Sequence, residues 1–467
     1  MRVDVAIVGA GIAGLATAFE LQKRGVSFVV FDSRTRPGGV ILSEDADGYT
    51  IDAGPDSLLT QKPDGIRLCT ELGLADRLVP TLLPRLAFIQ RGGRLHALPA
   101  GSVLGIPTRF APFAMTRLFS WSGKLRMGRE LFVPPRRDTG DESIGAFIRR
   151  RFGDEAVDYL AEPLLAGIHA GDVDRLSIRA LFPRLVEAEA AHGSLLRAFR
   201  RGPSAPPSPD GVFRSLPGGL SELVAAVTKA LPAAALRLGT CVTSVGRMGA
   251  RATERGSFRV ETGDTAVEAN AVVMAAPAYV TSRLVHELNP RLAALCGEVP
   301  YASTGTVALA FRRDAVRHRL AGSGFVVPRV EGTGILAASW LSSKWPHRAP
   351  AGKALMRTFV GGARDPHALE HDDRELVARS VAALRPLLGI TGEPEFSRVY
   401  RFERASAQHE VGHLERMSAI GHALSDTQGL FVTGSGFRGV GIPDCVADAR
   451  ATAAGVATWL SECRPAH

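Results

Sequence analysis

The chain has 467 residues, of which 45% are apolar and 22% are charged, and its formal net charge is +9. This length predicts more than one structural unit, and the composition excludes a disordered chain. The sequence contains no uninterrupted apolar run long enough to cross a bilayer. An apolar run begins within the first few residues and the cysteines are scattered, so we expect no signal peptide, no disulfide framework and a cytoplasmic location.

The N-terminal residues have the pattern of a βαβ unit. Residues 3–8 form an apolar run typical of a buried strand, residues 9–14 a glycine-rich turn, and residues 15–24 an amphipathic helix. A second strand is expected over residues 27–32. The chain therefore opens with the supersecondary unit of a nucleotide-binding α/β fold.

The middle of the chain changes character. Residues 85–200 have mainly helical patterns, with Asp141 as an expected N-cap, and they end in a proline-rich linker at residues 201–211. Short strands are expected between residues 236 and 360, followed by a strand at 430–433, a glycine loop and a helix over residues 443–460. The predicted fold class is α/β (α+β): a Rossmann-like domain, a mixed-sheet domain and an inserted helical domain.

Positive charge is concentrated in one part of this helical region. Residues 105–151 contain ten Lys and Arg residues against four Asp and Glu, together with many large apolar residues such as Phe110, Trp121 and Phe132. A surface that is both basic and apolar favours a membrane over nucleic acid. We therefore expect peripheral membrane contact and no nucleic-acid partner; the alternative is a helix that packs internally and leaves its charged face in solvent.

The glycine turn carries a dinucleotide-binding motif. Gly9 permits the tight turn, Gly11 allows the backbone to approach a pyrophosphate, and Gly14 lets the helix pack on the strand. The N-terminus of the helix offers free N–H groups to the phosphates. Asp32 ends the next strand and is expected to accept hydrogen bonds from ribose hydroxyls.

The continuation from Asp32 to Gly39, with Arg36, Gly38 and Gly39, resembles the fingerprint of the flavin amine oxidase, phytoene desaturase and protoporphyrinogen oxidase superfamily. The resemblance implies non-covalently bound FAD, and residues 51–55 and 430–444 resemble two further flavin-binding segments. The FAD-contacting residues that it implies are Gly9, Ala10, Gly11, Ile12, Ala13, Gly14, Asp32, Ser33, Arg36, Gly38, Gly39, Val40, Ala53, Gly54, Pro55, Asp56, Val242, Gly434, Val440, Gly441 and Ile442.

Within that superfamily the chain resembles the protoporphyrinogen oxidase family along nearly its whole length. The resemblance rests on residues 153–157, 162–172, 176–178, 182–183, 217–219, 358–362 and 411–413. It implies a discontinuous FAD domain at residues 1–85, 212–290 and 400–467. It also implies a substrate domain at residues 86–95 and 291–399, and a helical, membrane-associated domain at residues 96–211.

The implied reaction is oxidation of protoporphyrinogen IX to protoporphyrin IX in haem biosynthesis. Hydrides pass to flavin N5 and then to molecular oxygen, and oxidation of coproporphyrinogen III is the alternative. By matching motifs, Phe359 stacks on the tetrapyrrole, Gly167 offers backbone near its centre, and Val326 and Leu336 sandwich a ring. The family's propionate-binding Arg is displaced, so Arg85 is expected to serve in its place. No catalytic side chain and no metal are expected, and a homodimer is left open.

Other readings compete with this one. His409-Glu-Val-Gly-His413 matches a zinc protease motif, but Gly412 lowers its helix propensity and a third ligand is hard to supply. An amine oxidase of the same superfamily would use a covalent Cys before the C-terminal glycine loop and a Lys near the flavin. Cys445 falls after that loop, and Lys344 is the one lysine in a plausible substrate segment. A non-catalytic flavin or tetrapyrrole carrier also remains an alternative.

Overall fold

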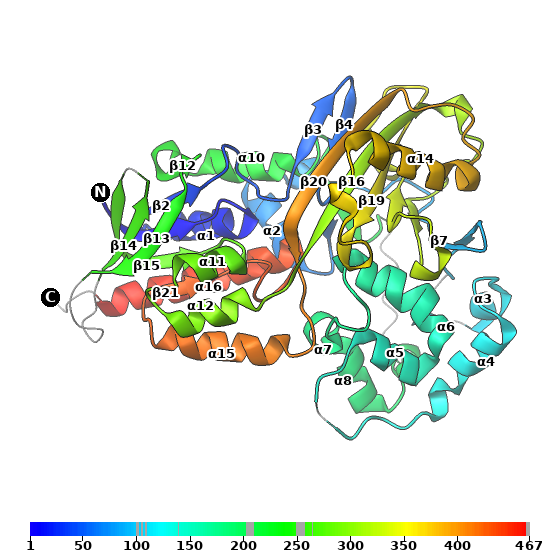
Figure 1. Ribbon diagram of the computed structural model, residues 1–467, viewed down its shortest axis with the longest axis horizontal. Coiled ribbons are helices and arrows are strands. Elements are labelled where there is room, and N and C mark those ends of the chain that lie inside the picture. Colours follow the sequence, from blue (N-terminus) through cyan, green and yellow to red (C-terminus); the bar gives the residue numbers. More distant parts are fainter. Residues whose placement is uncertain are drawn as a thin grey trace.

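The computed structural model describes residues 1–99, 102–103, 106–107, 110–138, 140–201, 210–248, 257–263 and 265–463. Figure 1 shows a sheet with flanking helices on the left, a second sheet at the upper right and a helical module below that sheet. Segments distant in sequence share each lobe: the blue N-terminus and the red C-terminal helix lie side by side in the left lobe. The predicted fold class is confirmed by this arrangement.

The sheet of the left lobe has seven strands in the order β12-β2-β1-β15-β14-β13, with β21 paired to β15. Strands β12, β2, β1, β15 and β21 run parallel, as expected for the nucleotide-binding unit, and β13, β14 and β15 form an antiparallel meander. The strands are β1 (Arg2–Val8), β2 (Phe28–Asp32), β12 (Leu236–Leu238), β13 (Val242–Arg247), β14 (Phe258–Thr262), β15 (Ala266–Met274) and β21 (Leu430–Val432).

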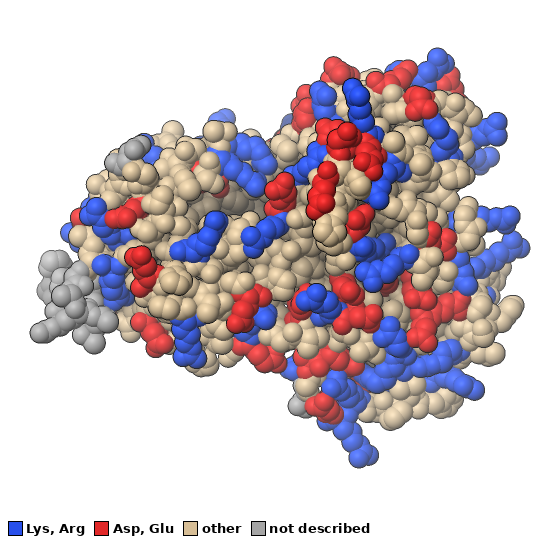
Figure 2. Space-filling view, viewed as in Figure 1, with Lys and Arg blue, Asp and Glu red and all other residues tan. Residues whose placement is uncertain are grey.

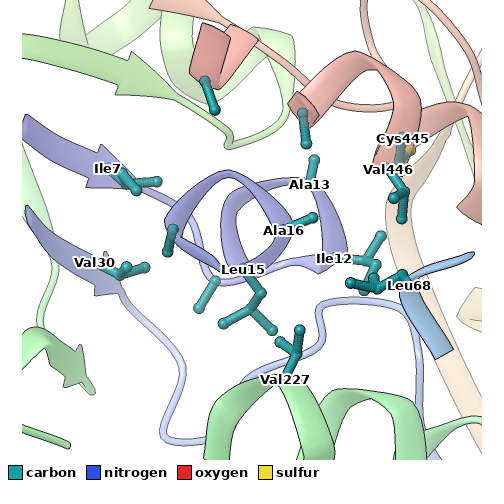
Figure 3. Packing of buried hydrophobic residues seen from close by; sticks show 14 of the residues in the cluster. Ile7, Ile12, Ala13, Leu15, Ala16, Val30, Leu68, Val227, Cys445 and Val446 are labelled. Atoms are coloured by element: carbon teal, nitrogen blue, oxygen red, sulfur yellow. The ribbon is translucent and has the colours of Figure 1, made fainter. Parts of the chain in front are cut away.

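Helix α1 (Ile12–Lys23) is the centre of the main hydrophobic core. It packs on the sheet and is surrounded by α2 (Pro63–Glu71), α10 (Ser221–Ala230) and α16 (Ile442–Cys463). In Figure 3 Leu15 points toward Val227, Ile12 lies beside Leu68, and Ala13 faces the start of α16 near Val446. The small side chain of Ala13 allows close approach, so the N-termini of α1 and α16 lie next to each other.

The second sheet also has seven strands, in the order β20-β16-β19-β18-β17-β7-β8. All its neighbours pair antiparallel except β17 and β7. Helix α14 (Asp373–Leu388) covers part of it, and its buried residues join a core with Val307, Phe311 and Trp340. The strands are β7 (Ala87–Arg91), β8 (Arg94–Ala97), β16 (Tyr301–Arg312), β17 (Gly324–Val326), β18 (Ala337–Ser339), β19 (Lys353–Gly361) and β20 (Phe396–Ala407).

The helical module lies below this sheet (Figure 1). Its elements are α3 (Phe110–Met115), α4 (Trp121–Gly128), η2 (Arg129–Phe132), α5 (Ile144–Phe152), α6 (Asp154–Ala156), the π-helix η3 (Val157–Ala166), η4 (Gly167–His169), α7 (Ile178–Leu181), α8 (Pro183–His192) and α9 (Leu195–Arg201). A fully buried Arg151–Glu130 ion pair holds the module together, and Glu130 also accepts hydrogen bonds from Ser194 Oγ and the Leu195 backbone N–H at the start of α9.

The expected N-cap of α5 was wrong by two positions. Ser143 caps this helix, since its Oγ accepts a hydrogen bond from the Ala146 N–H at 3.1 Å. Asp141 instead accepts a hydrogen bond from Ser177 Oγ at 2.6 Å. Within the described part of the chain, no helix has both the length and the apolarity needed to cross a membrane.

Candidate active site

The glycine turn between β1 and α1 has the geometry that the motif requires. Gly9 has a φ of +114°, and a Cβ there would lie 2.8 Å from the Ala275 carbonyl. A Cβ at Gly14 would overlap the Gly9 carbonyl oxygen, whereas one at Gly11 would meet nothing within 4 Å. Side chains are therefore excluded where the turn and helix pack, and open space remains beside Gly11. The first-turn N–H groups of α1 face this space without partners inside the helix.

Asp32 ties this turn to the neighbouring strand. Its Oδ2 accepts a hydrogen bond from the Ala10 N–H at 2.7 Å, and its Oδ1 accepts one from the Arg34 N–H at 2.8 Å. The carboxylate thus fixes the loop as well as offering lone pairs to a ribose. Val242 begins the strand whose preceding residues, Gly239 and Thr240, donate to the Arg34 and Asp32 carbonyls, so it lies beside the expected adenine end.

Arg36 and the following glycines continue this cradle. The Arg36 guanidinium donates to the carbonyls of Gly39 at 2.7 Å and Ile41 at 3.2 Å. The Gly38 N–H donates to the Ala10 carbonyl at 2.8 Å, and Gly38 has a φ of +99°. Arg36 therefore shapes the segment that carries Gly38, Gly39 and Val40, while Ser33 and Val40 are exposed at its rim.

A loop at residues 53–56 lies against the second sheet through a buried charge cluster. Arg357 Nη1 donates to the Gly54 carbonyl at 2.6 Å and to the Asp52 carbonyl, and its Nη2 lies 3.2 Å from Asp56 Oδ2. Lys344 Nζ donates to both oxygens of Asp56, at 2.9 and 2.8 Å. Burial would raise the pKa of Asp56, but Lys344 and Arg357 outweigh it and hold that pKa far below its usual range, so the carboxylate stays ionised.

The C-terminal glycine loop lies where α16 begins. A Cβ at Gly434 would lie 3.6 Å from the Ala13 side chain, which places this loop against the start of α1. Ile442 is buried, whereas Gly441 is exposed at the N-terminus of α16. The structure therefore brings the glycine turn, the loop at 53–56 and the segment from Gly434 to Ile442 to one edge of the first sheet.

Three of the expected substrate residues also come together. Leu336 donates its N–H to the Phe359 carbonyl at 2.7 Å, and the Val327 N–H donates to the Leu336 carbonyl at 2.9 Å. Val326 pairs with Ala337, which in turn pairs with Phe359 across β17, β18 and β19. Val326 contacts the core of the helical module, so this row lies where sheet and module meet.

The expected substrate residue Gly167 lies at the end of the π-helix. The Ala363 N–H donates to the Ala170 carbonyl at 2.8 Å, four residues after Phe359 in the sequence. Glu162, within the π-helix, pairs with Arg364 and accepts from the Arg329 N–H at 2.9 Å. These contacts hold the Gly167 turn against the segment that follows Phe359, and π-helical turns are frequent at functional sites.

Arg85 lies apart from the contacts that join these residues. Its Nε donates to Thr81 Oγ1 at 3.0 Å and to the Thr81 carbonyl at 3.1 Å. A Cβ at Gly211 would lie 2.8 Å from its Cδ, so the side chain packs on the end of the proline-rich linker. The Arg85 guanidinium is thus anchored to Thr81 through its Nε.

Sequence reasoning missed Arg357, Glu162 and the roles of Lys344 and His409. Lys344 has no free amine to offer in the described structure, because both oxygens of Asp56 accept its hydrogens. Cys445 is buried, and burial raises the pKa of its thiol to about 12, so it does not provide a thiolate for a covalent flavin link. One sequence pattern could have indicated Arg357: it lies two residues before Phe359 in the same strand, and residues two apart in a strand point to the same face.

The motif at residues 409–413 does not form a metal site. The two histidine rings stack on each other, and each Nε2 lies within hydrogen-bond distance of a backbone carbonyl. Among the described residues, no group of three or more His, Cys, Asp or Glu side chains is placed to hold a metal ion. The helix begins only at His413, so the motif lacks the continuous helix that a zinc protease requires.

These elements have the fold and the glycine turn of a dinucleotide-binding protein, and the loop at residues 53–56 connects them to the second sheet through Arg357 and Lys344. The family model for flavin-containing amine oxidoreductases matches residues 12–457. The chain therefore belongs to the flavin-containing amine oxidoreductase family, and the predicted FAD cofactor and oxidoreductase activity are confirmed.

Known relatives span almost the whole chain. It is 35% identical to a coproporphyrinogen III oxidase of Bacillus subtilis (strain 168), over 98% of both chains. It is 30% identical to the chloroplastic protoporphyrinogen oxidase of Nicotiana tabacum, over 98% of this chain and 86% of the relative. The crystal structure of a presumed protoporphyrinogen oxidase from Exiguobacterium sp. 255-15 is 31% identical, with a TM-score of 0.85 over 98% of this chain and 99% of the other. The resemblance expected from the motifs is confirmed.

Proposed function

We propose that this chain is an FAD-dependent porphyrinogen oxidase of haem biosynthesis. The observation that carries the proposal is the link between the two sides of the site. Arg357 donates to the Gly54 carbonyl, and its guanidinium carbon lies 4.7 Å from the centroid of the Phe359 ring. The residues expected to contact FAD and those expected to contact a tetrapyrrole are therefore joined by one side chain.

The side chains need to supply little beyond orientation. FAD, when bound, supplies the hydride acceptor. Phe359 offers an aromatic face, and Val326 on β17 and Leu336 directly before β18 offer apolar side chains, so a flat, largely apolar macrocycle would be held with water excluded. The Gly167 turn brings backbone rather than a side chain toward it, which leaves room for the substrate. We propose molecular oxygen as the final acceptor, with hydrogen peroxide as its product.

Two porphyrinogens are candidate substrates. Protoporphyrinogen IX, which the sequence favoured, is supported by the chloroplast relative, and coproporphyrinogen III by the bacterial one. The bacterial relative is more similar, at 35% against 30% identity, and it matches over 98% of its own length against 86%. We therefore propose that the chain oxidises both and turns over coproporphyrinogen III more efficiently.

Anaerobic mixing of a porphyrinogen with the oxidised holoenzyme tests this function. The expected result is bleaching of the flavin absorption together with the rise of porphyrin fluorescence, followed by peroxide formation when air is admitted. A polyamine or monoamine substrate in the same experiment is the control for an amine oxidase. Bleaching by neither porphyrinogen would overturn the proposal, and steady turnover distinguishes an enzyme from a carrier.

We also propose that the helical module docks on an anionic membrane surface and that the protein is cytoplasmic. Among the described residues between 115 and 132 of this module, four large apolar side chains are strongly exposed: Met115 by 82%, Trp121 by 73%, Leu125 by 72% and Phe132 by 82%. Other apolar residues of the same stretch, Leu118, Phe119 and Met127, are buried, so the outward ones are not needed for the core. Figure 2 shows Lys and Arg side chains gathered over the lower right lobe that holds this module.

Vesicle binding tests this docking surface. The protein is expected to sediment with phosphatidylglycerol vesicles, less so with neutral ones, and to be released by salt. The Trp121→Ser, Leu125→Ser, Phe132→Ser triple variant should lose binding while its flavin spectrum is unchanged. Equal partition of the triple variant and the unchanged protein would overturn the proposal.

We also propose boundaries for the three domains. We place the FAD domain, the substrate domain and the helical module as the resemblance implies, with one adjustment. Strand β20 runs from Phe396 to Ala407 in the second sheet, so we propose that the last FAD segment starts after Ala407 rather than at residue 400. Limited proteolysis at the linker around residues 202–210 would test the boundary of the helical module.

A further inference from the structure

Two histidines stack on each other where β20 leads into helix α15 (His413–Ser425): His409 lies between the two elements, and His413 is the first residue of the helix. The ring centroids of His409 and His413 are 3.8 Å apart, and the ring planes differ by 11°. His409 Nε2 lies 3.0 Å from the Ser435 carbonyl oxygen, and His413 Nε2 lies 2.8 Å from that of Phe437. Because a carbonyl oxygen can only accept, each Nε2 carries a hydrogen and donates it.

Both rings are neutral in this arrangement. His413 Nδ1 is buried and has no hydrogen-bond partner within the described part of the chain, so a second proton there would be an unsatisfied buried donor. Burial, and then the neighbouring His413, lowers the pKa of His409 to about 4, and burial lowers the pKa of His413. Asp444 and His169 interact electrostatically with His409, Arg416 interacts with His413, and Lys62 interacts with His169.

The accepting carbonyls belong to the C-terminal glycine loop, which α16 holds from its opposite side. Asp448 accepts hydrogen bonds from Thr433 Oγ1 at 2.7 Å and from the Gly434 N–H at 3.1 Å, and it pairs with Arg438. Gly436 packs so closely on the Tyr301 hydroxyl that a Cβ would overlap it. The loop is therefore clamped between Asp448 and the two histidines.

The segment that carries His409 also contacts the Gly167–His169 turn, which belongs to the expected substrate side of the site. Gln408 Nε2 and Ser406 Oγ each donate to the His169 carbonyl at 2.9 Å. The Ser177 N–H donates to the His409 carbonyl at 2.9 Å. The segment from Ser406 to His413 thus contacts the Gly167–His169 turn through its first residues and the flavin-side loop through its two histidines.

We propose that His409 and His413 are positioning residues whose Nε2 hydrogens fix the Ser435 and Phe437 carbonyls, and so set the flavin-side loop at its distance from the Gly167–His169 turn. The loop's contact with FAD and the hydride step rest on the function proposed above. This role also explains the two histidines four residues apart without a metal ion.

Paired substitutions distinguish the effect of the Nε2–H donor from the effect of the stacked ring. His409→Phe and His413→Phe keep a flat ring for the stack and remove the donor, and His409→Gln and His413→Gln keep an N–H at similar reach. His409→Asn and His413→Asn, whose amides are shorter, remove the donor by a second route should a Phe variant fail to fold. His422→Phe is the matched control, because His422 is an exposed histidine on the same helix.

The measurements are the FAD dissociation constant of the apoprotein, by flavin fluorescence, and the spectrum and reduction potential of the bound flavin. We expect donor loss to weaken FAD binding about ten-fold, the effect of losing one buried hydrogen bond, and to shift the flavin potential. The Gln variants should stay within about three-fold of the unchanged protein, and His422→Phe should equal it.

Two results would overturn the proposal: Phe and Asn variants with unchanged FAD affinity and potential, or Gln variants as impaired as the Phe variants. Single-turnover bleaching at saturating FAD adds a further measurement, in which donor loss should slow the bleaching rate and leave substrate affinity unchanged. If no porphyrinogen bleaches the unchanged protein, the proposed function fails, and the FAD titration still decides the role of the histidines.

Discussion

The guanidinium of Arg357 covers one face of Phe359 while its Nη2 lies 3.2 Å from the Asp56 carboxylate. Arg357 is 2% exposed and Asp56 is 7% exposed, so this pair is removed from solvent. One side chain therefore orients the ring expected under the tetrapyrrole and anchors the loop expected under the flavin. A substitution of Arg357 would therefore affect the position of the Phe359 ring and of the loop at residues 53–56 together.

Arg357→Met is expected to destabilise the protein and to lower its activity. It leaves Asp56 paired with Lys344 but removes the donors to the Gly54 and Asp52 carbonyls, and a hydrogen bond to a charged group contributes about 1.5–3 kcal/mol. Thermal unfolding and FAD titration measure the effect. Arg398→Met is the control, because Arg398 stacks on Phe396 at an exposed site. Equal unfolding temperatures for the two variants would contradict the prediction.

Asp32→Ala is expected to weaken FAD binding by about 1–3 kcal/mol, the size of a charge-assisted hydrogen bond. The substitution also releases the Ala10 and Arg34 N–H groups that hold the glycine turn. Asp32→Asn keeps one acceptor oxygen and should lose less. Fluorescence titration of the apoprotein gives both constants, and Glu287→Ala, at an exposed position, is the control. An unchanged constant for Asp32→Ala would remove Asp32 from the cofactor site.

Part of this site could be predicted because local chemistry dictates it. Gly9 and Gly38 need a positive φ, and Asp32 must end its strand near the turn, so short-range patterns identified the cradle. Arg357 could not be found in this way, because its partners Gly54 and Asp56 lie about 300 residues earlier in the sequence and meet it only through the fold. The sequence indicated that Gly412 lowers the helix propensity of the His409 motif, and in the structure Gly412, with a φ of +90°, lies in a turn directly before α15 begins.

Stability is expected to fall as the pH drops from about 7 toward 4. His409 has an ordinary pKa of 6.5 that burial, followed by the neighbouring His413, lowers to about 4 in the folded chain. Between these values the unfolded chain binds a proton that the folded chain does not, so folding is favoured above pH 6.5 and loses that advantage below it. Two to three pKa units correspond to about 3 kcal/mol at pH 4.

Urea unfolding at pH 8, 6 and 5 measures this dependence. His409→Gln removes the titrating group, so the free energy of unfolding of this variant should decrease less steeply between pH 8 and pH 5 than that of the unchanged protein. His422→Gln, at the exposed site, should leave the slope as it is. Identical slopes for His409→Gln and the unchanged protein would show that other groups, such as His169, whose pKa burial also lowers to about 4, dominate.

Arg85→Ala is expected to raise KM more than it lowers kcat, if Arg85 leaves Thr81 to bind a propionate. The structure gives Arg85 a partner in Thr81 through its Nε. Thr81→Val removes the Oγ1 acceptor and keeps the carbonyl acceptor, so it should change KM less than Arg85→Ala does. Steady-state kinetics with protoporphyrinogen and coproporphyrinogen measure both effects. Parallel loss of kcat with KM unchanged would assign Arg85 to the linker contact alone.

The last prediction concerns the number of substrate carboxylates. Protoporphyrinogen carries two propionates and coproporphyrinogen four, and an unpaired carboxylate buried in an apolar cavity costs several kcal/mol. The cations near the expected contacts are already paired: Lys344 with Asp56, Arg364 with Glu162 and Lys62 with Asp444. Of these, Lys62 is the most exposed and its pair with Asp444 is the easiest to exchange.

The proposed function favours coproporphyrinogen III, so we expect a higher kcat/KM for it, with its additional propionates lying toward the exposed cation Lys62 rather than the apolar row at Phe359. Lys62→Met should reduce that preference, and Lys229→Met, on the distant helix α10, should leave it unchanged. Anaerobic bleaching rates for each porphyrinogen, measured over a range of concentrations, give the two ratios. Faster bleaching by protoporphyrinogen in the unchanged protein would contradict this prediction and would make protoporphyrinogen, with its two carboxylates, the preferred substrate.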